Sequence, residues 1–133
     1  MIHAMRKFIK IAVSTVLILV AAFLLFGVAV RSLFIVMRMS TGTMQPLITT
    51  NDIVIAARHF DVASLRSGDL VVVVLPVGDN SIPTVRKIAQ QTNTPAGQFY
   101  LVATGTNSID SRQLGALPAA DIRGKVIQIV RGR

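Results

Sequence analysis

The first quarter of the chain carries one long apolar run. Residues 11–30 contain no charged side chain, and the run is interrupted only by Ser14, Thr15 and Gly27. A helix rises 1.5 Å per residue, so about twenty residues cross the roughly 30 Å hydrocarbon core of a bilayer. The pattern therefore predicts a transmembrane anchor helix over residues 11–31, preceded by a short tail over residues 1–10.

A cleaved signal peptide is the rival interpretation of this run. Arg6, Lys7 and Lys10 form a basic segment before it, and small residues lie near Gly27 at its end. The apolar part of a signal peptide is about 7–15 residues long, shorter than this run, so we favour an uncleaved anchor. The basic tail predicts a cytoplasmic N-terminus. Residues 32–133 are then expected on the periplasmic or extracellular side of the cytoplasmic membrane.

Beyond the apolar run, short β-rich segments alternate with turn residues. The segments rich in branched or aromatic side chains are 33–37, 53–57, 70–75, 84–89, 99–103 and 124–130. Gly, Pro and Asn separate them, and no long soluble helix is indicated. Residues 70–75, Leu-Val-Val-Val-Val-Leu, predict a strand buried on both faces. The fold class is therefore mainly β, a compact barrel or folded sheet after a single transmembrane helix.

One predicted strand places two basic residues side by side. Arg86 and Lys87 occupy adjacent positions in the segment 84–89. Side chains alternate between the two faces of a strand, so one of the pair must point inward or into a cleft. The other should point to the opposite face unless a β-bulge shifts the register by one residue.

The net charge of the chain bears on whether it binds nucleic acid or anionic lipid. The formal net charge is +8, but the basic residues are scattered, and one Tyr and no Trp offer little for base stacking. We therefore expect no nucleic-acid binding, and favour a basic face that is solvated or rests on anionic lipid. The chain has no cysteine, and His3 and His59 are too far apart in sequence to suggest a metal centre. We expect no cofactor.

Five motifs after the apolar run follow one another in a recognisable order. They are TGTMQPLITTND at 41–52, GDLVVVVLP at 68–76, RKI at 86–88, GTNSIDSR at 105–112 and GALP at 115–118. In this order the chain from 38 to 130 resembles type I signal peptidases, the membrane-anchored Ser/Lys proteases that trim secretory leader peptides. The resemblance implies a signal-peptidase-like β domain over residues 32–133.

The resemblance also assigns positions in a catalytic site. Thr43 stands where the family has its nucleophilic serine, and Arg86 where it has its general-base lysine. Thr41 matches the hydroxyl that helps bind the oxyanion, together with Thr43. Ser108 matches the serine that orients the lysine amine.

Two further positions are expected to be structural. Asp110 and Arg112 are predicted to form an ion pair that braces the loop. Asp52 is expected to accept turn hydrogen bonds from backbone amides. The tail Arg131–Arg133 is expected to be frayed and solvated.

The substitutions at the nucleophile position, Thr43, and at the base position, Arg86, differ in their consequences for catalysis. Threonine is a known class of nucleophile, although its branched side chain restricts χ1. A guanidinium group is effectively never deprotonated in a protein, so Arg86 cannot serve as the base. Lys87 is the nearby substitute, and it requires a change of register.

Our hypothesis from the sequence is a degenerate member of the family, a non-catalytic subunit or scaffold of a membrane complex. Its partners would be the lipid bilayer and other membrane-protein subunits. The alternative is an active, divergent peptidase that uses Thr43 and Lys87 and cleaves leader peptides after small residues. A third possibility is a lipid- or peptide-binding module without enzymatic ancestry.

Overall fold

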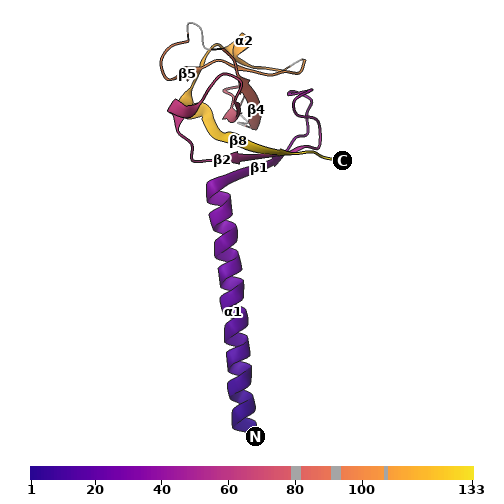
Figure 1. Ribbon diagram of the computed structural model, residues 1–133, viewed down its shortest axis with the longest axis vertical. Helices are drawn as coiled ribbons and strands as arrows, with labels where there is room; N and C mark the ends of the chain where they lie inside the picture. The colour runs from indigo at the N-terminus through magenta and orange to yellow at the C-terminus, as the bar shows by residue number, and fades with distance from the viewer. Residues whose placement is uncertain (79–81, 91–93, 107) are drawn as a thin grey trace. The chain divides into compact units, whose positions relative to one another are not determined.

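The chain divides into two units, Met1–Leu33 and Phe34–Arg133. The computed structural model describes residues 1–78, 82–90, 94–106 and 108–133 (Figure 1). The segments between the predicted strands at 70–75, 84–89 and 99–103 therefore lie partly outside the described residues.

The first unit is a single helix, α1 (Ile2–Leu33). Its 32 residues rise about 48 Å, and none of them is buried. Helix α1 is long and apolar enough to cross a membrane, and a signal sequence near an N-terminus meets the same two criteria. The predicted apolar helix is confirmed, and it begins at Ile2, so most of the predicted tail is helical too.

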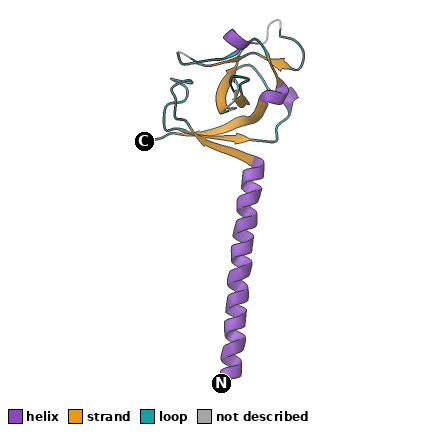
Figure 2. Cartoon of the chain, turned by 180° about the vertical axis from the view of Figure 1, so that it is seen from behind, coloured by secondary structure: helices purple, strands orange, loops and turns teal. Residues whose placement is uncertain are grey.

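The second unit is built mainly from antiparallel strands (Figure 2). Its principal strands are β1 (Phe34–Arg38), β2 (Ile53–Ala57), β3 (Leu70–Val74), β4 (Pro83–Ile88), β6 (Leu101–Val102) and β8 (Ile122–Val130). They form one sheet in the order β1-β2-β8-β3-β4-β6, and β5 (Gln98–Phe99) pairs separately with β7 (Leu117–Pro118). Short helical turns are η1 (Val62–Ser64), α2 (Ser111–Leu114) and η2 (Ala119–Asp121). A helix followed by a mainly β unit is thus the observed architecture.

Strand β3 separates two apolar clusters. The first cluster consists of Met39, Met44, Ile48, Val54, Ala56, Val72, Val85 and Ala103. The second cluster consists of Leu65, Val71, Val73, Ile88, Phe99, Leu101, Leu117 and Ile122. Val72 joins the first, whereas Val71 and Val73 join the second, and all three are fully buried. The prediction of a strand buried on both faces is confirmed, because alternating side chains of β3 reach two clusters.

The predicted strand at 99–103 is interrupted in the structure. Its first part, β5, pairs with β7, whereas β6 pairs with β4. Side chains rather than strand partners accept from two of its amides: Ser111 Oγ accepts from Leu101 N at 2.8 Å, and Asp110 Oδ2 accepts from Ala103 N at 2.7 Å. The loop that supplies these acceptors contains helix α2, which periodicity did not indicate because it is only one turn long.

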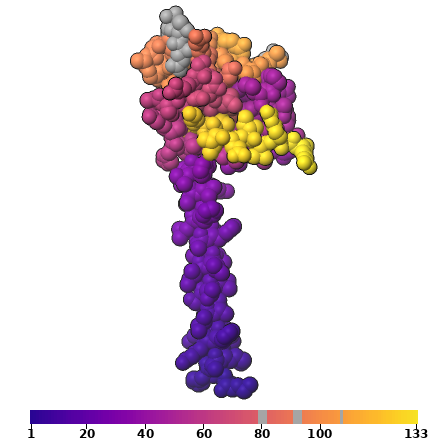
Figure 3. Space-filling model, in the orientation of Figure 1, coloured from indigo at the N-terminus to yellow at the C-terminus, as the bar shows by residue number. Residues whose placement is uncertain are grey.

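The C-terminal tail was wrongly expected to be frayed. Arg131 Nη1 forms an ion pair with Asp52 Oδ2 at 2.8 Å and also donates to the Leu47 carbonyl oxygen. The backbone N–H of Gly132 donates to Asp52 Oδ1 at 2.9 Å. Figure 3 shows the yellow C-terminal residues against the violet segment that precedes β2. The tail is held because a buried carboxylate requires hydrogen-bond donors, and the chain end provides two of them.

Asp52 itself makes the turn contact that the sequence suggested. Its Oδ2 accepts from the backbone N–H of Thr49 at 2.9 Å. Hydrogen bonds from the amides of Thr49 and Gly132, aided by Arg131, lower the pKa of Asp52 to about 2 despite its burial. A carboxyl whose pKa is lower in the folded chain stabilises the fold above its unfolded pKa of 3.8, and this stabilisation is lost as the pH falls through about 2.

The lowered pKa of Asp52 predicts that the stability of the chain decreases at acid pH, and that this decrease, the acid limb, depends on Asp52. The thermal midpoint of the full chain in detergent should fall between about pH 4 and pH 2. Asp52→Asn should lower the midpoint at pH 7, because an amide cannot form the ion pair with Arg131, and should flatten the acid limb. Asp121→Asn is the matched control and should behave as the parent chain. Parallel acid limbs in the parent and the Asp52→Asn chain would contradict this account.

Candidate active-site region

The segment between β1 and β2 carries the predicted nucleophile position. Met44 and Ile48 are fully buried in the first cluster and fix this segment to the core. Thr43, which directly precedes Met44, is half-buried, and Thr41 is exposed. The hydroxyl oxygens of Thr41 and Thr43 lie 3.3 Å apart, within hydrogen-bond reach of each other. Two hydroxyls therefore lie together at the position that the sequence motif indicated.

A second loop lies directly against this segment. The backbone N–H of Gly105 donates to the carbonyl oxygen of Thr43 at 2.8 Å. A Cβ on Gly105 would collide with the carbonyl oxygen of Gly42 and would lie 3.0 Å from the carbonyl carbon of Thr43. Glycine is required here by this close approach of two backbones, which brings the loop at Gly105 beside Thr43.

Arg86 is buried on β4 and bound to the same loop. Its side chain is only 3 % exposed. Nε and Nη2 both donate to the carbonyl oxygen of Ile109, the latter at 2.9 Å. Nη1 donates to the Val85 carbonyl oxygen at 2.7 Å and to the Thr84 hydroxyl at 2.9 Å. Every one of these contacts uses an N–H of the guanidinium as donor, and the guanidinium is effectively always protonated in proteins, so the buried group is a cation.

The Asp110 carboxylate contributes to the electrostatic environment of Arg86. Burial lowers the pKa of the Arg86 guanidinium, and the Asp110 carboxylate opposes that change. The hydrogen bonds and the nearby negative charge compensate for part of the cost of burying the cation. Even with a lowered pKa, a guanidinium offers no lone pair that could accept a proton at neutral pH.

Asp110 braces the loop on which Arg86 depends. Its side chain is fully buried, and its oxygens accept from the amides of Ala103 and Arg112 and from the Arg112 guanidinium, with a closest ion-pair distance of 2.8 Å. Burial alone would raise the pKa of Asp110, but the hydrogen bonds from Arg112 and Ala103 lower it overall. Asp110 with Gln113 also forms a capping box at the start of α2.

Lys87 lies on the other face of β4. Residues 83–87 pair with 70–74 in continuous register, so the described part of β4 shows no bulge against β3. Arg86 is opposite Val71 of the second cluster, whereas Lys87 is opposite Leu70, which packs against the first cluster. The alternation expected from the sequence is therefore retained. Among the described residues, no hydrogen bond or ion pair of the Lys87 side chain is found.

The structure brings only some of the predicted site residues together. Thr41, Thr43 and the loop that contains Ser108 adjoin through Gly105, and Arg86 reaches the same loop at Ile109. Ser108 is buried, and its hydroxyl donates to the Thr106 carbonyl oxygen at 3.4 Å. Within the described residues, no hydrogen bond joins the Thr43 hydroxyl to a nitrogen of Arg86 or Lys87. The neighbouring Asn107 of the motif lies outside the described residues.

Several residues of this region were not indicated by the sequence analysis. Gln113 completes the capping box, and the spacing Asp-x-x-Gln from Asp110 is a signal that could have identified it. The contact of Gly105 with Thr43 joins residues 62 positions apart, and periodicity carries no information about such an approach. In the described residues, no group of three or more His, Cys, Asp or Glu could hold a metal ion.

Comparison with known proteins adds no relative: no protein-family model matches the chain, and no curated protein matches its sequence.

The backbone contact at Gly105 leads to a prediction about stability. Gly105→Ala should lower the free energy of unfolding by about 1–3 kcal/mol, because the new methyl group forces two backbones apart. Gly42→Ala is the matched control, since its Cβ would meet only the flexible end of the Gln45 side chain. Urea unfolding of both variants checks this. Equal effects at the two glycines would contradict the proposed contact.

Proposed function

We propose that this chain is a membrane-anchored, signal-peptidase-like protein whose catalytic site has degenerated, and that it acts as a non-catalytic subunit or scaffold of a membrane complex. The order of the five sequence motifs supports the family relationship. The proposed family domain would be a barrel or folded sheet, and α1 would be its uncleaved anchor. The domain would lie outside the cytoplasmic membrane.

Contacts among the motifs support this relationship. If the chain shares the family's site, the segment at 41–46, the strand at 84–88 and the loop at 105–112 should converge. The Gly105–Thr43 hydrogen bond joins the first and third of these, and the Arg86–Ile109 hydrogen bonds join the second and third. Convergence of three motifs far apart in sequence is what a common site requires.

One observation carries the loss of activity: the side chain at the proposed base position is a buried arginine that donates four hydrogen bonds. General-base catalysis requires a group that gains a proton from the nucleophile as it attacks. The guanidinium of Arg86 already carries all its protons, so the hydroxyl of Thr43 cannot be activated by it. The retained loop contacts would then serve the fold rather than a reaction.

An active peptidase that uses Thr43 and Lys87 is the second candidate. The observation in its favour is that Lys87 shares its face of β4 with Val85, in the cluster that also contains Met44, the neighbour of Thr43. The continuous register of β4 weighs against the bulge by which Lys87 would take over the position of Arg86. This candidate requires that Lys87→Ala abolish turnover.

A cleavage assay separates the two candidates. The full chain, purified in detergent, should release no product from a leader peptide with an Ala-x-Ala cleavage site beyond that released by its Thr43→Ala variant. Lys87→Ala should also leave this background unchanged. Cleavage by the parent chain that is absent from Thr43→Ala would refute the degenerate site. If Lys87→Ala also loses this cleavage, the active alternative is established.

A further inference from the structure

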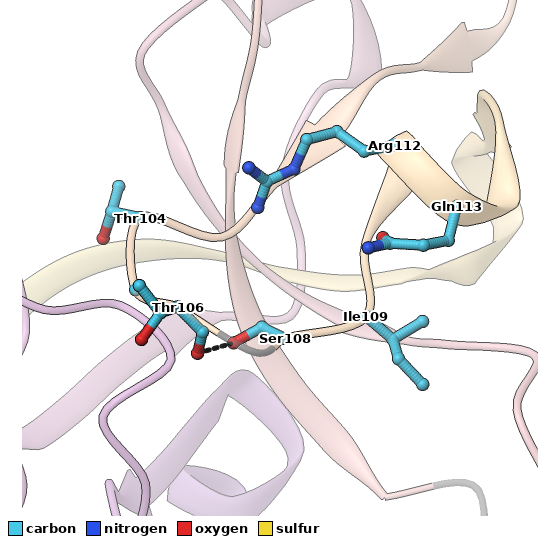
Figure 4. Close-up of a pocket in the computed structure, with 7 residues that line it drawn as sticks. Thr104, Thr106, Ser108, Ile109, Arg112 and Gln113 are labelled. Atoms are coloured by element: carbon cyan, nitrogen blue, oxygen red, sulfur yellow. Dashed lines mark hydrogen bonds between the residues drawn. The ribbon is translucent and has the colours of Figure 1, made fainter.

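An open pocket lies beside the loop that follows β6. Its volume is about 610 Å³ (Figure 4). The described residues that line it are Thr104, Gly105, Thr106, Ser108, Ile109, Arg112 and Gln113. Thr43, Arg86 and Lys87 are not among them, but Ser108, matched above to the serine that orients the family's lysine, is, so the pocket adjoins the proposed catalytic positions.

Arg112 supplies the charge of this pocket. Its Nε and Nη2 bind the Asp110 carboxylate, and Nη2 also reaches the Ala103 carbonyl oxygen at 3.5 Å. Among the described residues, no acceptor is found for the two N–H groups of Nη1. The ion pair holds the guanidinium in place while its side chain remains 54 % exposed. The fork is therefore oriented in advance and keeps donors for a ligand.

Three residues of the lining carry hydroxyl groups. Thr104 Oγ1 is buried and has no hydrogen-bond partner in the structure. Thr106 and Ser108 bring two more hydroxyls to the lining. Figure 4 shows the guanidinium of Arg112 directed toward the stretch that contains Thr104 and Thr106.

The local charge favours an anion. Arg112 is the one charged residue among the described residues that line the pocket. The Asp110 carboxylate beside it is fully engaged by Arg112 and by backbone amides, and buried Arg86 adds a further positive charge near that carboxylate. An oxyanion with several acceptor oxygens matches a guanidinium fork in a pocket that is also lined by the hydroxyl residues Thr106 and Ser108. We propose that this pocket binds a phosphate group.

The test compares two substitutions at one exposed position. Thr106→Glu places a carboxylate in the pocket and leaves the Arg112–Asp110 ion pair intact, whereas Thr106→Gln is similar in size and neutral. Isothermal titration of the full chain in detergent with inorganic phosphate should give saturable binding at low millimolar concentration or tighter. Thr106→Glu should weaken it at least about tenfold through charge repulsion, and Thr106→Gln by less than about threefold.

Two results would overturn the proposal. One is the absence of saturable binding to the parent chain. The other is equal weakening by Thr106→Glu and Thr106→Gln, which would show that binding does not depend on charge at this pocket. Thermal unfolding of both variants confirms that each is folded at the assay temperature.

The phosphate could come from a lipid headgroup or from a soluble ester, and a second arm distinguishes them. The chain is placed in nanodiscs of phosphatidylcholine with or without phosphatidic acid, and inorganic phosphate is titrated. If phosphatidic acid abolishes the Thr106→Glu-sensitive binding, the pocket takes a lipid headgroup. If that binding persists unchanged, the pocket takes a soluble phosphate.

Discussion

The hydrogen bonds between the Arg86 guanidinium and the Ile109 carbonyl oxygen hold the centre of the β unit together. They attach β4, a strand that lies between β3 and β6, to the loop that contacts Thr43. A cation with 3 % exposure persists only where acceptors surround it, and Ile109, Val85 and Thr84 provide them. The same constraint fixes the chemistry, because a group that donates every contact cannot accept a proton. The cation whose hydrogen bonds stabilise this region therefore cannot act there as a proton acceptor.

Two buried carboxylates organise the segments on either side of this contact. Asp110 holds the loop after β6, and Asp52 holds the segment before β2 to the end of the chain. Each is paired with an arginine whose side chain is largely exposed, so that the carboxylate is neutralised while the cation keeps contact with water. Arg112 thereby gains a fixed orientation at the mouth of a pocket. Arg112 can both form the ion pair with Asp110 and offer donors to a ligand, because the planar guanidinium of arginine has five N–H donors.

The sequence predicted what depends on local pattern. Strand β2 was predicted with its observed bounds, and the run at 70–75 correctly indicated burial on both faces. The adjacency of Arg86 and Lys87 required one inward side chain, and burial identifies it as Arg86. The sequence could not indicate that Arg131 pairs with Asp52, since the two are 79 residues apart and only the folded sheet brings them together. Helix α2 was missed because four residues are too few to show a period, although its capping box left a readable signal.

We expect Arg86, the group at the proposed base position, to be a permanent cation. The most direct test is an NMR titration of the full chain in detergent, with the guanidinium ¹³C and ¹⁵N resonances of Arg86 assigned through Arg86→Lys. We expect constant shifts, characteristic of a protonated guanidinium, from about pH 6 to about pH 10. A titration of these resonances within that range would show that Arg86 releases a proton where a peptidase works, and would contradict the account.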